Sequence, residues 1–128
     1  MRDDKECLLD ILEAIENIER YTQERNAFEK EELFQVWTIH HIQIIGEATA
    51  RLSENLRDNY PEIPWPQIIS MRSIIGHHYF SVDTNEIWST VERDLPKLKD
   101  DVKKFFGNIN LTNNLLYAVF RPFQNRLF

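Results

Sequence analysis

Cysteine and glycine are scarce in this chain of 128 residues. The single cysteine, Cys7, excludes an intrachain disulfide framework and a zinc site built on several cysteines. Only three glycines and five prolines are present, too few for a collagen-like or largely disordered protein. Because Cys7 stands among apolar residues, we expect its thiol to be buried.

Long apolar runs are also lacking. No run approaches the roughly 18–20 apolar residues that span a bilayer. The polar residues 1–6 are followed by an amphipathic pattern and not by the apolar core of a signal peptide. We therefore expect a cytoplasmic protein with no membrane partner.

Acidic residues outnumber basic ones by 21 to 15, which gives a net charge of −6. Extended binding to a phosphate backbone draws on many Lys and Arg side chains, so the charge argues against a general nucleic-acid coat protein. A local basic spot that grips RNA briefly remains compatible with this balance.

Several catalytic and metal-binding signatures are missing. The chain has no Gly-rich phosphate loop, no nucleophile elbow and no HExxH motif. His40 and His41 are adjacent, so they point to different faces of a helix, and neither has a partner ligand at i+3 or i+4. We expect no metal site and no cofactor, and we interpret His40 as a partly buried histidine with its hydrogen bonds satisfied.

Apolar residues recur at helical spacing along four stretches, at about residues 3–25, 30–57, 65–76 and 83–106. Pro66 suits a first helical turn, and Asp83 or Thr84 can cap the fourth helix. Pro96 is expected to kink that helix or divide it in two. The core stripe predicted for the second helix consists of Leu33, Val36, Trp37, His40, Ile44, Ala48, Leu52 and Leu56.

This pattern predicts an all-α fold, an antiparallel bundle of four to five helices. Residues 1–106 form the bundle. Residues 107–128 form a C-terminal extension, poor in acids and rich in apolar residues. The extension adds a short helix at about 112–120, or docks on the bundle or on another subunit. Gly46 interrupts the second helix, and close approach of another helix would explain it.

Residues 71–80 form the unusual segment, because Arg72, His77, His78 and Tyr79 surround a predicted helix end near Gly76. Arg72 and Tyr79 are seven residues apart and fall on nearly the same helical face, whereas Arg72 and His77 are about 140° apart at 100° per residue. A helix that ends near Gly76 can bring the three side chains to one point.

This trio suits RNA cleavage without a metal, in which the 2′-OH of the RNA attacks the adjacent phosphate. A histidine moves protons near neutral pH, and an arginine fork holds the phosphate and stabilises developing charge. A simpler interpretation of the spacing is a surface arginine with a capping histidine, since cations are favoured at helix C-termini.

The motif Arg72-x4-His77-x-Tyr79 resembles the R-x(4–6)-H-x-Y signature of HepT-like proteins in the HEPN superfamily. The resemblance covers about residues 5–106. Other segments resemble family patterns in the same order: Ile45-Gly46-Glu47-Ala48, Arg51-Leu52-Ser53, residues 60–65, Tyr79-Phe80-Ser81-Val82-Asp83 and Asp94-Leu95-Pro96.

The resemblance implies a HEPN-like homodimer in which the two motifs face a shared cleft. It implies a metal-independent endoribonuclease, the toxin of a toxin–antitoxin pair. The implied antitoxin is an MntA-type minimal nucleotidyltransferase that transfers AMP to the motif tyrosine. Carried over, Arg72 and His77 are catalytic and Tyr79 is the AMPylation site.

Glu47, Ser73 and His78 are expected to support the site. Glu47 matches a family position on the second helix and is expected to line the cleft, although a solvated acid beside a glycine is an equal interpretation. Ser73 departs from the family, which often has Asn or another amide or acidic residue there.

Two other functions fit the chain. One is a non-catalytic helical dimer that binds a nucleotidyltransferase and presents Tyr79 to it. The other is a purely structural dimerisation module, which leaves the Arg/His/Tyr cluster unexplained.

Overall fold

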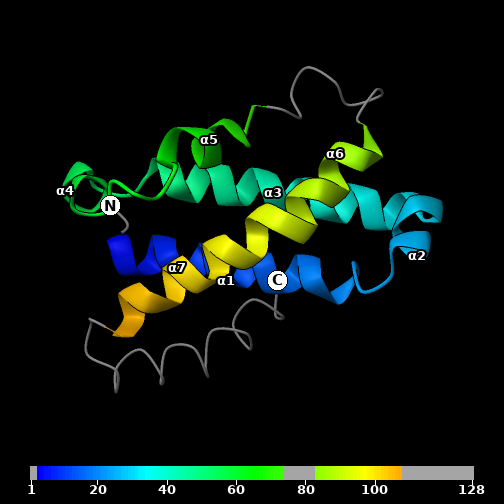
Figure 1. Ribbon diagram of the computed structural model, residues 1–128, viewed down its shortest axis with the longest axis horizontal. Helices are drawn as coiled ribbons and strands as arrows, with labels where there is room; N and C mark the ends of the chain where they lie inside the picture. The colour runs from blue at the N-terminus through cyan, green and yellow to red at the C-terminus, as the bar shows by residue number, and fades with distance from the viewer. Residues whose placement is uncertain (1–2, 74–82, 108–128) are drawn as a thin grey trace.

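The structure, a computed structural model, describes residues 3–73 and 83–107, and every regular element in these ranges is helical (Figure 1). The all-α class is thereby confirmed. Residues 108–128, nearly all of the expected C-terminal extension, lie outside the described residues. The elements in chain order are α1 (Asp4–Arg20), α2 (Arg25–Lys30), α3 (Glu32–Ala50), α4 (Glu54–Asn59), α5 (Trp65–Ser70), α6 (Thr84–Ser89), the π-helical segment η1 (Thr90–Asp94) and α7 (Leu95–Gly107).

The antiparallel pair α1 and α3 forms the centre of the fold (Figure 1). Asp3 caps α1, since its carboxylate accepts a hydrogen bond of 2.8 Å from the Glu6 N–H. The thiol of Cys7 is buried, as expected, together with an apolar row along α1. Burying such side chains stabilises the fold by roughly 1.5–3 kcal/mol each. The fully buried members of the row are Leu8, Ile11, Ile15 and Ile18.

The core stripe predicted for the second helix is wrong in its first half and confirmed in its second, where Ala48 and Leu52 are buried and Ile44 and Leu56 pack against the core. Leu33 is 77% exposed, and Val36, Trp37 and His40 are also exposed. The sequence of α3 is apolar on nearly all sides, so its periodicity does not single out one face. The buried residues of α3 are Thr38, His41, Ile42, Ile45, Gly46, Ala48 and Thr49.

The second predicted helix also ends earlier than expected, at Ala50 instead of Arg57. Ser53 interrupts it and caps α4, accepting a hydrogen bond of 3.1 Å from the Leu56 N–H. Asp4 of α1 holds this cap, because its carboxylate accepts from both the N–H and the hydroxyl of Ser53, at 2.8 and 2.7 Å. A capping serine favours a new helix start over continuation of the old helix.

Helix α5 begins at Trp65 with Pro66 in its first turn, as predicted. The indole N–H of Trp65 donates to the carbonyls of Arg57 and Tyr60. The helix ends at Ser70 and not near Gly76. Residues 71–73 form a turn in which Arg72 and Ser73 bond to carbonyls three residues back. Such i→i−3 bonds tighten and terminate a helix. The turn fixes where Arg72 leaves α5.

The fourth predicted helix begins at Thr84, capped by Asp83, as expected. Pro96 divides it as predicted, although the break is a π-helical segment and not a simple kink. The ring of Pro96 would clash with the carbonyl four residues earlier, and the wider π turn of η1 relieves that clash. Helix α7 then packs on α1, and Lys99 forms an ion pair of 2.8 Å with Glu19.

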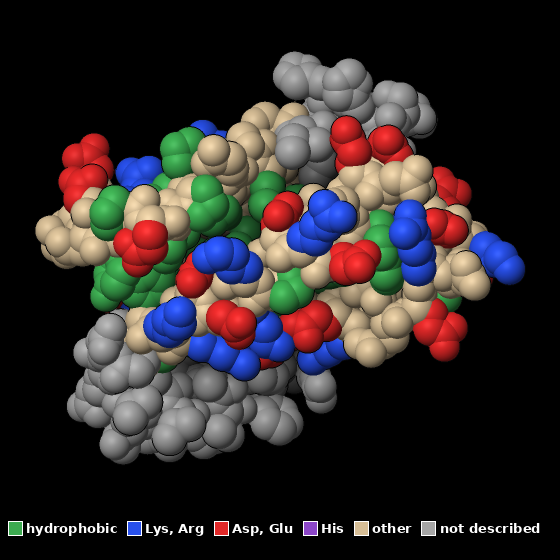
Figure 2. Space-filling view, in the orientation of Figure 1, with side chains coloured by type: hydrophobic (Ala, Val, Ile, Leu, Met, Phe, Trp, Pro, Cys, Tyr) green, Lys and Arg blue, Asp and Glu red, His purple; other side chains and the backbone are tan. Residues whose placement is uncertain are grey.

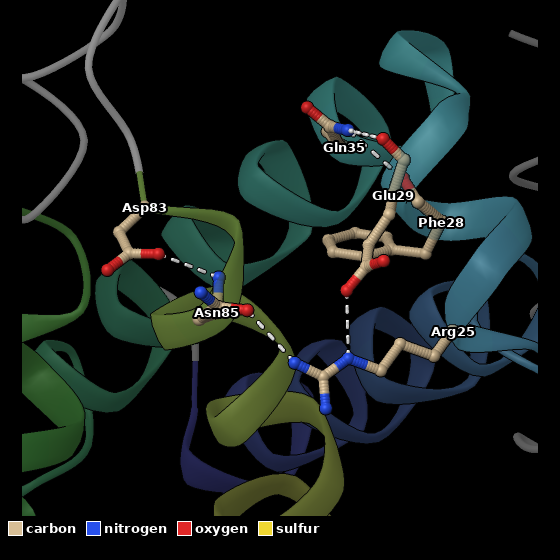
Figure 3. Close-up of polar contacts among 6 residues, drawn as sticks. All are labelled: Arg25, Phe28, Glu29, Gln35, Asp83 and Asn85. Atoms are coloured by element: carbon tan, nitrogen blue, oxygen red, sulfur yellow. Dashed lines mark hydrogen bonds and ion pairs between the residues drawn. The ribbon is translucent and has the colours of Figure 1, made fainter.

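Arg25 joins α2 to the start of α6 (Figure 3). Its guanidinium donates to the carboxylate of Glu29 and to the side-chain carbonyl of Asn85, each at 2.9 Å. Asn85 is held in turn by Asp83, whose carboxylate accepts from the Asn85 N–H at 2.9 Å. The ring of Phe28 in α2 also packs against the ring of Trp88 in α6. The network anchors the chain directly after residue 82.

The face that carries α7 shows acidic and basic side chains interspersed, with apolar side chains visible between them (Figure 2). A mixed surface of this kind gives no single-sign field on that face. Among the described residues, no helix has the length and apolar character needed to cross a membrane.

Candidate functional site

Arg72 is seated directly on α3 at Gly46. A Cβ atom at Gly46 would lie 2.6 Å from the backbone N of Arg72 and 2.9 Å from its Cβ. Real Cβ atoms do not approach backbone that closely, so only glycine permits this contact. A close approach at Gly46 is confirmed, although the segment that approaches is the turn after α5 and not a helix. The contacting residue is Arg72, the predicted catalytic arginine.

The same contact places Arg72 beside Glu47. The Nη1 atom of Arg72 lies 3.8 Å from Oε2 of Glu47, and the two side chains are 43% and 48% exposed. An exposed pair at this distance contributes at most about 1 kcal/mol, so the guanidinium keeps donors free to engage another anion. Arg72 therefore presents a charged fork to solvent on a rigid backbone support.

Of the other predicted site residues, Ser73 is described and the rest are not. The Ser73 hydroxyl donates to the carbonyl of Ser70 at 3.1 Å, so its side chain serves the helix end. His77, His78 and Tyr79 lie outside the described residues. Of the predicted set, the structure thus brings together Arg72 and Glu47, while Ser73 bonds to the end of α5.

The interpretation of His40 was wrong, and His41 is the buried histidine. His40 is exposed on the outer face of α3, whereas the Nδ1 atom of His41 lies 2.8 Å from the carbonyl oxygen of Trp37. Burial lowers the pKa of His41 below its ordinary value of 6.5, and the neighbouring His40 lowers it further, against the opposing effect of the Trp37 carbonyl. His41 is therefore neutral at pH 7 and serves the core.

Within residues 3–73 and 83–107, no group of three or more His, Cys, Asp or Glu side chains is placed to hold a metal ion. Arginine is not a metal ligand, so the described part of the site offers an anion-binding fork. Its chemistry is recognition of a phosphate or carboxylate.

A groove of about 360 Å³ adjoins Glu47 on the outer face of α3, and the sequence did not reveal it. Asp10 of α1 forms one side of it. The other lining residues follow His40 along the helix at i+3, i+4, i+7 and similar spacings, so they share one helical face. That spacing is visible in the sequence, but the face had been assigned to the core. The groove is lined by Asp10, His40, Gln43, Ile44, Glu47, Ala48 and Arg51.

Known proteins are similar to this chain along most of its length. A probable ribonuclease HepT of Thermococcus cleftensis is 39% identical over 105 residues, which cover 80% of this chain and 96% of that relative. A Methanocaldococcus jannaschii protein named as a proposed RNase is 33% identical over 104 residues, covering 80% of this chain and 95% of its own length.

A second protein of Methanocaldococcus jannaschii is longer. It is named as a gamma-glutamylcyclotransferase and proposed RNase, and it is 38% identical over 123 residues. The match covers 94% of this chain but spans only 55% of the length of that relative. No solved structure matches the chain.

The family model described as ribonuclease HepT-like matches residues 11–105, and thus includes Gly46, Glu47 and Arg72. The match extends over far more than half of the 128 residues. From these matches and the all-helical fold, we conclude that this chain belongs to the HepT-like ribonuclease family.

Proposed function

We propose that the protein is a metal-independent endoribonuclease, the toxin of a toxin–antitoxin pair. The observation that carries this proposal is Arg72, which a HepT-like chain holds against Gly46 with its guanidinium half exposed. The backbone contact fixes the point from which the arginine side chain extends, and a cation in that position can stabilise the phosphate charge that develops in a transition state.

The proposed reaction cleaves RNA through its own 2′-OH. The 2′ oxygen forms a bond to the adjacent phosphorus while the bond to the 5′ oxygen breaks, which yields a cyclic phosphate and a 5′-hydroxyl. Arg72 holds the non-bridging phosphate oxygens in this scheme. His77 moves the proton, since an imidazole titrates near neutral pH.

We propose that the protein acts as a homodimer, and the outer face of α3 supports this. The α3 apolar patch, defined as Tyr21, Leu33, Val36 and Trp37, comprises the exposed large apolar side chains of the described residues. Trp37 is fixed in place, because its indole N–H donates to the Asn17 carbonyl at 2.8 Å. A helix that is apolar on all sides usually has both faces covered.

Control by an MntA-type nucleotidyltransferase forms part of the proposal. AMP attached to Tyr79 would bring a phosphate diester near Arg72, seven residues earlier in the chain. The guanidinium would pair with that phosphate and no longer be available to RNA. Undiminished AMP labelling of Tyr79→Phe would show that another residue is modified.

A non-catalytic role is the second candidate, and Ser73 favours it. Its short side chain is engaged with the Ser70 carbonyl, at the position where the family resemblance leads us to expect Asn or another amide or acidic residue. In this second scheme the dimer binds a nucleotidyltransferase and presents Tyr79 as its substrate, with no RNA cleavage.

Growth arrest on induced expression distinguishes the ribonuclease from the non-catalytic binding protein. The intact chain is compared with Arg72→Ala and His77→Ala, and with Arg93→Ala as an exposed arginine on η1. A nuclease arrests growth, loses toxicity in the first two variants and keeps it in the third. Circular dichroism confirms that each variant folds. Absence of toxicity in the intact chain, together with intact RNA after incubation with pure protein, would establish the non-catalytic role.

A further inference from the structure

A second groove, of about 390 Å³, opens between α1 and the run of chain from α6 to α7. We call it the α1/α7 groove. Its floor is apolar, because the buried side chains of Ile15, Ile18 and Leu95 line it. Trp88 and Val91, which are half-buried, continue the apolar lining. No residue of the α3 apolar patch lines this groove, so it is separate from the proposed dimer contact.

The charged residues of the α1/α7 groove leave it net negative. Its cation, Lys99, is already paired with Glu19 at 2.8 Å. Glu92 and Asp100 also line the groove, and both are exposed. Because binding surfaces are complementary in charge as well as in shape, an occupant of this groove should combine apolar side chains with positive charge.

The π-helical segment η1 adds a backbone acceptor to the groove. The Leu95 N–H donates to the carbonyl of Thr90, five residues earlier, as in a π-helix. The next carbonyl, of Val91, would then receive the N–H of residue 96, but that residue is Pro96 and has none. Neither the α-helical nor the π-helical donor therefore serves Val91, which lines the groove. A guanidinium, which only donates, suits this carbonyl and the acids beside it.

Residues 121–128 have the chemistry that the groove requires. They contain Arg121 and Arg126 and no acidic residue. The two arginines are separated by about 16 Å in an extended chain, at roughly 3.3 Å per residue. Glu92 and Asp100 are separated by about 12 Å along the helix, at roughly 1.5 Å per residue, so both arginines can reach an acid at once. The apolar side chains of this segment are Pro122, Phe123, Leu127 and Phe128.

The chain between Gly107 and this segment is long enough to return to the groove. Helix α7 ends at Gly107, at the end of the molecule where α1 begins, whereas the groove lies along the later half of α1 (Figure 1). Residues 112–120, where the sequence predicts a helix, span about 13 Å at roughly 1.5 Å per residue. A helix of that length that runs back along α7 brings Arg121 beside Asp100.

We propose that the α1/α7 groove binds residues 121–128 of the same chain. Arg121 pairs with Asp100, Arg126 pairs with Glu92, and the apolar side chains between and after the arginines cover the floor. The inference is independent of the proposed ribonuclease function, because no lining residue of this groove belongs to the candidate site.

The test is the rate at which trypsin cuts the full chain after Arg126, which mass spectrometry detects as the loss of the two residues that follow. A synthetic peptide of residues 108–128 gives the rate for the undocked segment. The full chain should be cut at least about tenfold more slowly, because trypsin acts on the segment only when it has left the groove. Cleavage as fast as in the free peptide overturns the proposal, whatever the variants do.

Charge reversal then locates the contact. Asp100→Arg should speed the cut about fivefold, because it removes an ion pair and places two like charges together. Combining it with Arg121→Asp should restore slow cleavage. Asp94→Arg changes an exposed acid of η1 that does not line the groove, and it is the matched control that should leave the rate unchanged. Slow cleavage that Asp100→Arg does not alter would place the segment elsewhere and overturn the assignment.

A monomeric variant separates docking within one chain from docking between two copies. Leu33→Glu introduces a charge into the α3 apolar patch and so opposes dimerisation. Protection of the Arg126 bond should persist in this variant and should not change on dilution of the protein. Protection that disappears together with the dimer would show that the groove holds the segment of a second copy, which overturns docking within one chain. None of these results depends on whether RNA is cut.

Discussion

Gly46 shows at the scale of one residue how the fold positions a functional side chain. Exchange of glycine for alanine within a helix usually stabilises by up to about 1 kcal/mol. At Gly46 the added methyl would meet the backbone of Arg72 at 2.6 Å, and backbone cannot move aside as a flexible side chain can. This steric clash therefore outweighs the gain in helix propensity and makes Gly46→Ala destabilising.

We predict that Gly46→Ala destabilises the protein by about 1–3 kcal/mol, the usual cost of overpacking. Because Arg72 must shift, RNA cleavage should fall further than stability explains. Urea unfolding and cleavage rates measure the two effects. Lys103→Gly, at an exposed position in α7, is the control and should cost about 1 kcal/mol by propensity alone. A stabilised Gly46→Ala variant would contradict the close packing.

His41 makes stability depend on pH, because its pKa in the folded protein lies below its ordinary value of 6.5. Above pH 6.5 the ring is neutral in both the folded and the unfolded protein, so its contribution to the free energy of unfolding is fully present. As the pH falls below it, the unfolded chain takes up a proton that the folded protein refuses, so stability decreases until the folded pKa is passed. We predict lower urea midpoints at about pH 5 than at about pH 7.5. His41→Gln should flatten this dependence, and an unchanged slope would count against the assignment.

At the scale of elements, the sequence predicts helix existence better than helix boundaries. The start of α1, the cap of α6 at Asp83 and the break at Pro96 follow from local rules of capping and backbone geometry. The break at Ser53 depends on Asp4, forty-nine residues earlier, so no local window reveals it. The buried face of α3 likewise depends on its tertiary partners.

Ser53 links α1 to α4, so the loss of its side chain should weaken both the cap of α4 and the contact with α1. We predict that Ser53→Ala lowers stability by about 1–3 kcal/mol, since it removes a helix cap and a bond to a charged carboxylate. Thermal unfolding would show this as a drop of about 3–5 °C for each kcal/mol. Ser89→Ala, within α6, is the control and should change stability by less than about 0.5 kcal/mol.

The candidate site divides in the same way between what sequence reveals and what it does not. Arg72 and Glu47 were predictable as site residues from the family resemblance, and their ion pair requires knowledge of the contact at Gly46. The groove with Asp10 and His40 escaped prediction, because it forms where two helices meet and because His40 was assigned to the core.

At the scale of the whole molecule, the α3 apolar patch predicts self-association. Light scattering at about 10 µM should give a dimer for the intact chain, as the proposed homodimer requires. Leu33→Glu places a charge within the α3 apolar patch and should shift the protein to monomer, with its helical content unchanged. Lys103→Glu, an exposed change on α7, should leave the dimer intact. A monomeric wild-type protein would exclude the proposed assembly.

The π-helical segment η1 has a consequence for chain length. Ile87 and Leu95 both face the core although they are eight residues apart, which on a regular α-helix leaves them about 80° out of line. A π turn accommodates one extra residue relative to an α-helix. Residues 90–94 therefore take up one residue that a regular α-helix could not hold with both side chains facing the core. A relative with one residue fewer in this segment can form a continuous α-helix with the same side chains facing inward.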